Sequence, residues 1–105
     1  MEKEIIKVDE KQYELKYNEK TIENIESITG KAFLSIIMSD KGMLSLTAMR
    51  QYFSNALYAV EGGRVSAEQG SIVFEKVLNA KGFAYVNMLI ITTIQRDCPF
   101  FFLGA

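Results

Sequence analysis

The sequence has no histidine, so the commonest general base and the commonest metal ligand of proteins are both missing. It has a single cysteine, Cys98, which excludes an intramolecular disulfide and fits a reducing, cytoplasmic setting. No histidine can activate this thiol, and an apolar tail follows it. We therefore interpret Cys98 as an inert, packed side chain rather than a nucleophile.

An excess of positive charge is also missing, because 12 basic residues face 13 acidic residues and the net charge is −1. The chain therefore lacks the electrostatic footprint of a nucleic-acid-binding protein. A net charge near zero weakens repulsion between copies, so it leaves a homo-oligomer open. The first residues, MEKEIIKVDEKQ, lack the long apolar segment of a signal peptide.

Residues with catalytic or metal-binding spacing are scarce. Glu23 and Glu26 share one face of a predicted helix, where a solvated face with ion pairs is the simpler explanation. Asp40 and Asp97 are isolated, and no loop carries carboxylates at the spacing of a calcium site. Neither Gly62-Gly63-Arg64 nor Thr29-Gly30-Lys31 is a phosphate-binding loop, because neither has the multi-residue cradle followed by Lys and Ser or Thr that the motif requires. The sequence therefore predicts no enzyme, no metal site and no cofactor.

The composition is that of a globular protein, with 49% of the 105 residues apolar and 24% charged. A chain of this length most simply forms one domain over residues 1–105. Residues 3–8 and 12–17 are short runs rich in β-branched or aromatic side chains, and the Asp-Glu-Lys between them can turn. We expect a β-hairpin over 3–17, which must pack on other elements to be stable.

Helical spacing of apolar residues begins after the hairpin. Asn18, Ser45 and Ser66 are typical N-caps, Gly30 can end a helix in the left-handed region, and Pro99 ends the last helix. These signals predict helices at about 19–29, 31–39, 46–61, 67–80 and 83–97, with one kinked helix as the alternative to the first two. The third rests on an apolar stripe of Leu46, Met49, Phe53, Ala56, Leu57 and Val60. The sequence therefore predicts an α+β fold, mainly α, with the N-terminal hairpin packed on a bundle of four to five short helices.

The helix expected at 83–97 is apolar on nearly all sides. A transmembrane helix needs about 20 mostly apolar residues, whereas this stretch is shorter and contains Asn87 and Gln95. A core helix with neighbours on several sides is therefore preferred to a membrane span.

The C-terminal half carries more apolar residues than one helix stripe can bury. The four residues 100–103 cannot all point the same way in a regular conformation, so some should cover the core and the rest should form an exposed cluster. Exposed apolar clusters mark interaction sites. We hypothesise a partner-binding surface, called here the terminal patch, formed by Met88, Ile91, Phe100, Phe101, Phe102 and Leu103.

The five methionines can either fill the core or form an adaptable recognition surface. Core filling is the simpler interpretation for Met49 and Met88. Met38 and Met43 flank a turn, so we expect them to be exposed.

The order of these elements resembles a known family. The segment YELKYNEKTIENIESITGKAF, residues 13–33, runs from an alternating strand into an Ile-x-x-Ile-Glu helix closed by Thr-Gly-Lys. Two amphipathic helices follow, the second opened by SAEQG, and an apolar helix ends in Asp-Cys-Pro-Phe-Phe. This order, spacing and size, over nearly the full length, resembles the small tail assembly chaperones of long-tailed bacteriophages, including the gene-transfer-agent-like branch.

The resemblance implies a function in binding, without catalysis. Such chaperones coat the tape measure protein, a long and partly hydrophobic helical chain, keep it soluble and recruit tail tube subunits. They act in the cytoplasm of an infected or lysogenic host and are absent from the mature virion. Tape measure protein and tail tube protein are thus the implied partners, with no nucleic acid and no membrane among them.

Two other classes of protein remain as alternatives. The helices at 46–61 and 67–80, joined by EGGRVS, could form a helix-turn-helix in a small adaptor or regulatory domain. The polar residues of the second helix are net acidic, however, which is unfavourable for a recognition helix. An enzyme subunit without its own active site is the other alternative.

Overall fold

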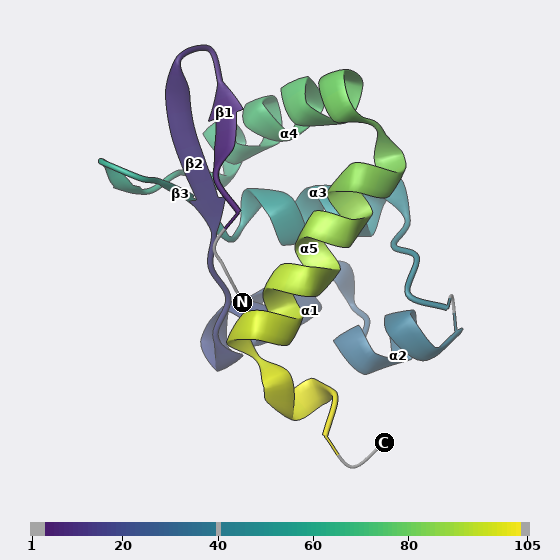
Figure 1. Cartoon of the computed structure of the whole chain (residues 1–105). Coiled ribbons are helices and arrows are strands. Elements are labelled where there is room, and N and C mark those ends of the chain that lie inside the picture. Colours follow the sequence, from purple (N-terminus) through teal and green to yellow (C-terminus); the bar gives the residue numbers. More distant parts are fainter. Residues whose placement is uncertain (1–3, 40, 104–105) are drawn as a thin grey trace.

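The computed structural model describes residues 4–39 and 41–103 (Figure 1). These residues form a four-stranded antiparallel sheet, five α-helices and one 3-10 helix, which confirms the predicted α+β, mainly α, class. The elements are, in chain order, β1 (Ile6–Val8), β2 (Lys11–Leu15), α1 (Glu19–Thr29), α2 (Phe33–Ser39), α3 (Leu46–Ser54), β3 (Leu57–Ala59), β4 (Gly63–Arg64), α4 (Ala67–Lys81), α5 (Phe83–Asp97) and η1 (Pro99–Phe101). The predicted start of the hairpin at residue 3 lies outside the described residues.

Four of the five α-helices begin where the sequence predicts, whereas α2 begins at Phe33, two residues later than predicted. The Asn18 side chain accepts a hydrogen bond from the Thr21 amide at 2.9 Å, and Ser45 and Ser66 cap α3 and α4 in the same way. Gly30 ends α1 with a φ of 73°, so α1 and α2 are two helices and not one kinked helix.

The third helix is shorter than predicted, and the prediction is wrong beyond Ser54. The Asn55 side chain donates to the Gln51 carbonyl at 2.9 Å, which satisfies one of the last carbonyls of α3. The chain then forms β3, which pairs antiparallel with β2, and β4, which pairs with β3. Backbone pairing with the open edge of β2 therefore overrides the helical spacing of residues 55–61. Of the predicted stripe, Leu46 and Val60 are exposed, whereas Met49, Phe53, Ala56 and Leu57 are buried.

The sheet has the strand order β1-β2-β3-β4, so β1 and β4 are its edges. The predicted hairpin is confirmed as β1 and β2, joined at Asp9 and Glu10, which both have positive φ. Residues 57–64 extend this hairpin to four strands, and they also separate α3 from α4. The two helices are therefore not joined by the short turn that the helix-turn-helix alternative requires.

One continuous core joins the sheet to the helices. Helix α5 crosses the molecule between α4 and η1, and it packs on α3 (Figure 1). Its residues Val86, Leu89, Ile90 and Ile94 are buried, which confirms the interpretation of this segment as a core helix. None of the helices in the described ranges is long and apolar enough to cross a membrane.

Candidate partner-binding surface

The aromatic residues after α5 form one cluster with α2. The Phe101 ring lies 4.9 Å from the Phe33 ring, centroid to centroid, at an angle of 59°. Phe33 is fully buried and also contacts Tyr52 of α3 at 5.5 Å. Phe100 lies 4.7 Å from Phe101 on the outer side. A row of rings therefore leads from the core to the surface, and tilted pairs of this kind are favourable.

The residues 100–103 divide between core and surface, as the sequence analysis expects. Phe101 and Phe102 are partly buried and pack against the core. Phe100 is 50% exposed and Leu103 is 74% exposed. The outer part of the cluster is therefore available to a partner.

The α5 part of the terminal patch lies apart from these aromatic residues. Met88 is 63% exposed, so its interpretation as a core residue is wrong, and Ile91 is partly buried. The helical rise of about 1.5 Å per residue places Met88 about 14 Å along the axis from the end of α5 at Asp97. The terminal patch therefore has two separate parts, one on α5 and one at η1, and is not a compact cluster.

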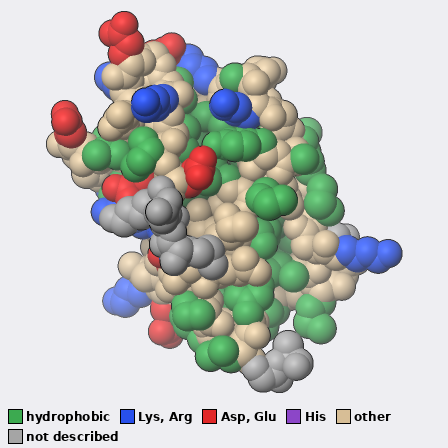
Figure 2. All heavy atoms as spheres, in the orientation of Figure 1, with side chains coloured by type: hydrophobic (Ala, Val, Ile, Leu, Met, Phe, Trp, Pro, Cys, Tyr) green, Lys and Arg blue, Asp and Glu red, His purple; other side chains and the backbone are tan. Residues whose placement is uncertain are grey.

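Helix α2 and the turn after it contribute apolar residues that the sequence hypothesis leaves out of the patch. Leu34, Met38 and Met43 are all exposed, and the exposure predicted for the two methionines is confirmed. α2 is joined to η1 through the Phe33 and Phe101 rings. Figure 2 shows hydrophobic side chains gathered at the lower end of the molecule and along its right-hand side. Met49, by contrast, is fully buried as expected.

Polar contacts fix the end of α5 to the start of the chain. Asp97 accepts a hydrogen bond from the Tyr17 amide at 2.9 Å and from Arg96 Nε at 2.7 Å. Arg96 also donates to the Leu15 carbonyl at 3.2 Å. These contacts join residues about 80 positions apart, and they hold the base from which η1 extends.

A second anchor is the buried amide of Asn87 in the middle of α5. Its oxygen accepts from the Leu44 amide, and its nitrogen donates to the Gly42 carbonyl, both at 2.9 Å. The same nitrogen lies 3.6 Å from the sulfur of Met43. Asn87 therefore positions the exposed methionine turn beside α5, a role that an asparagine within an apolar helix could have suggested.

The ionisable groups near the patch are packed in the core or bonded to the backbone. Cys98 is fully buried, which confirms that it is packed, and burial together with Asp97 raises the pKa of its thiol. Glu26 accepts from the Phe33 amide at 2.8 Å, so it serves as an N-terminal cap for α2 rather than as an ion-pair partner. Asp40 lies outside the described residues. Within the part of the chain that is described, no three Asp, Glu or Cys side chains gather to hold a metal ion.

Comparison with known proteins gives no relative: no protein-family model, no curated protein and no solved structure matches the chain.

Proposed function

We propose that this chain is a binding protein that covers apolar helical segments of a partner with its terminal patch. The observation that supports the proposal is the exposure of Phe100 and Leu103 at the well-anchored end of the molecule, together with that of Met88 farther along α5. Large exposed apolar side chains of this kind are typical of interaction sites. Their spacing along α5 and η1 suits a helix laid against them.

The resemblance to tail assembly chaperones supports a particular partner, the tape measure protein of a bacteriophage tail. In this proposal the chain coats that protein in the host cytoplasm, keeps it soluble and recruits tail tube subunits. The tube subunits later displace the chain, so it is absent from the mature virion. The protein carries out no catalysis and needs no cofactor.

The strength of each contact fits such a temporary role. Covering a half-exposed Phe, Leu or Met side chain contributes on the order of 1 kcal/mol. A few of these contacts give only modest affinity once the cost of association is included. Binding of many copies along one long partner raises the overall affinity through avidity.

A double substitution of exposed patch residues, Phe100→Ser with Leu103→Ser, tests the proposal. The variant is co-expressed with the tape measure protein of the same genome, and the soluble fraction and the pull-down yield are measured. We expect both to fall about tenfold, a loss typical of removing central contact residues. The thermal midpoint should change little, because both side chains are at least half exposed.

The matched control is Ile72→Ser, which removes an exposed apolar side chain from α4, outside the patch. Its pull-down yield should equal that of the wild type. A double variant that still solubilises the tape measure protein would show that the terminal patch is not the binding surface. Phe101→Ser should instead lower the thermal midpoint, since that ring packs on Phe33.

A further inference from the structure

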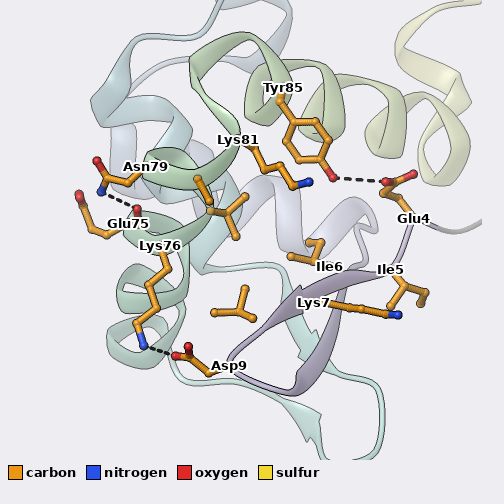
Figure 3. Close-up of a pocket in the computed structure, with 13 residues that line it drawn as sticks. Glu4, Ile5, Ile6, Lys7, Asp9, Glu75, Lys76, Asn79, Lys81 and Tyr85 are labelled. Carbon is orange, nitrogen blue, oxygen red and sulfur yellow. Dashed lines mark hydrogen bonds and ion pairs between the residues drawn. The ribbon is translucent and has the colours of Figure 1, made fainter.

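A groove of about 810 Å³ runs between the edge strand β1 and helix α4 (Figure 3). Strand β1 and helix α4 lie at the opposite end of the molecule from η1 (Figure 1). Residues 4–9 form one wall, and residues 75–77 and 79–81 of α4 with Tyr85 of α5 form the other. Two contacts span the groove, one at each end: Lys76 pairs with Asp9, and the Tyr85 hydroxyl donates to Glu4 at 3.2 Å. The chain on either side of β1 is therefore fastened to α4 at one end of the groove and to α5 at the other, with a space between.

The open edge of β1 leaves backbone groups available in this groove. The first pair after the two-residue turn at 9–10 is hydrogen-bonded, so the next pair, Lys7 and Gln12, is not. In agreement, the Gln12 carbonyl points the other way and accepts from the Val60 amide at 3.0 Å. Lys7 therefore directs its N–H and C=O to the open edge, where no backbone group outside the sheet binds them within residues 4–39 and 41–103.

Apolar surface lies below this edge. Ile6 and Val77 are buried at the base of the groove, and Val8 packs partly against the core. Ala80 is exposed on the α4 side. Because strand side chains alternate, Ile6 and Val8 point to one face of the sheet and Lys7 to the other.

The charge left over along the groove is slightly positive. Asp9 pairs with Lys76, and Glu75 pairs with Arg50 of α3. Glu4 keeps its negative charge because its partner, the Tyr85 hydroxyl, is neutral, so the ammonium groups of Lys7 and Lys81 exceed it by one positive charge. Lys7 and Lys81 have no carboxylate partner in the described part of the chain, and the Lys81 ammonium lies 5.8 Å from the centre of the Tyr85 ring. An occupant with carboxylates would complement these two ammonium groups.

We propose that this groove binds an extended segment of a partner protein in which acidic and apolar residues alternate. The segment pairs as a fifth strand with the outer edge of β1 and bonds to the backbone of Lys7. Its apolar side chains lie on the side of Ile6 and Val8, and its acidic side chains lie on the side of Lys7. This site is separate from the terminal patch. The two proposals are therefore tested independently, and a negative result for one surface says nothing about the other.

The probe is a capped heptapeptide of alternating Glu and Val, with a Lys and Val peptide as its charge-reversed counterpart. Each is titrated into the full-length, ¹⁵N-labelled chain while amide shifts are recorded at low salt. We expect shifts at residues 5–8 and 76–81 and at Tyr85, with the acidic peptide bound at least about tenfold more tightly than the basic one. Raising the salt concentration should narrow this difference.

Variants at Lys7 separate backbone pairing from charge. Lys7→Pro removes the outward N–H without removing a bond of the sheet, since proline is tolerated at such edge positions. This variant should bind the acidic peptide about tenfold less tightly, because a backbone hydrogen bond is lost and the edge is altered. Lys7→Ala keeps the N–H, so it should bind the acidic peptide only about threefold less tightly. Lys20→Ala, a matched lysine substitution on α1, should leave the affinity unchanged.

Three results would overturn the proposal. The first is equal affinity of the acidic peptide for Lys7→Pro and for the wild type. The second is a set of shifts that maps to the terminal patch instead of the groove. The third is dimerisation of the free chain that Lys7→Pro abolishes, which would make a second copy the occupant. If Lys7→Pro lowers the thermal midpoint, the double variant Lys7→Ala with Lys81→Ala replaces it as the test. An unchanged affinity of that double variant for the acidic peptide would also overturn the proposal.

Discussion

Gly70 lies in the first turns of α4, and its missing side chain lets this helix approach the backbone of α3. A Cβ atom at this position would lie 2.7 Å from the Ser54 carbonyl oxygen and 3.0 Å from its Cα. Backbone atoms cannot move aside as the end of a flexible side chain can. Gly70 therefore sets the distance between α3 and α4.

Gly70→Ala should lower the free energy of unfolding by about 1–2 kcal/mol, because the strain of overpacking exceeds the gain of about 1 kcal/mol in helix propensity. Chemical denaturation followed by circular dichroism measures the change. Gly62→Ala is the control, since a Cβ there would meet only the Ala59 side chain at an ordinary 3.4 Å. A Gly70→Ala variant as stable as the wild type would mean that the two helices can separate without cost.

At the scale of single elements, α5 anchors other segments of the chain through its polar side chains. Asn87 holds the 42–44 segment with two hydrogen bonds, one in each direction. Leu44 and Asn87 are both buried, so water cannot readily replace these bonds. A single side chain of α5 therefore supplies the hydrogen bonds that fasten the α2–α3 connection to this helix.

Asn87→Ala should destabilise the chain by about 2–3 kcal/mol, because it leaves the Leu44 amide and the Gly42 carbonyl without partners. Hydrogen exchange should show faster exchange of the Leu44 amide in this variant. Asn87→Asp keeps an acceptor for the Leu44 amide, so it should protect that amide better than Ala does. Equal exchange in all three proteins would show that other contacts hold the connection.

The sequence predicts the elements whose signals are local. The bounds of α1 agree with the prediction at both ends, and α4 and α5 agree within one residue, because capping side chains and glycines determine them. Residues 57–64 form strands because β2 offers an edge, and only the tertiary structure reveals that edge. The terminal patch was predicted as a set of residues, but its division into buried and exposed rings depends on the position of Phe33.

At the scale of the whole molecule, stability should depend on buried tyrosines. The Tyr17 hydroxyl donates to the Tyr52 carbonyl at 2.7 Å. Burial raises the pKa of Tyr17 well above its ordinary value of 10.0, with Tyr52, Asp97 and Cys98 adding to the effect. Burial, followed by Glu26, also raises the pKa of Tyr52. Both hydroxyls therefore stay protonated in the folded state at pH values where the unfolded chain ionises.

The sign of the pH dependence follows from linkage. Below pH 10 both states are protonated and the contribution of these tyrosines is fully present, whereas above it the unfolded state releases protons first. Thermal midpoints measured from pH 8 to 11 should therefore fall above pH 10. Tyr17→Phe should be about 1 kcal/mol less stable than the wild type at pH 8. Its thermal midpoint should fall less steeply above pH 10. Parallel curves for the two proteins would contradict the assignment to Tyr17.

The contact between Asp97 and the Tyr17 amide has a consequence for synthesis in the cell. A ribosome produces the strands and α1 long before α5, so the nascent chain must wait for its central core helix. Until Asp97 leaves the exit tunnel, the surfaces that later enclose α5 remain uncovered. Folding should therefore finish only after α5 has left the exit tunnel, and a stall before residue 97 should leave a species that general chaperones recognise.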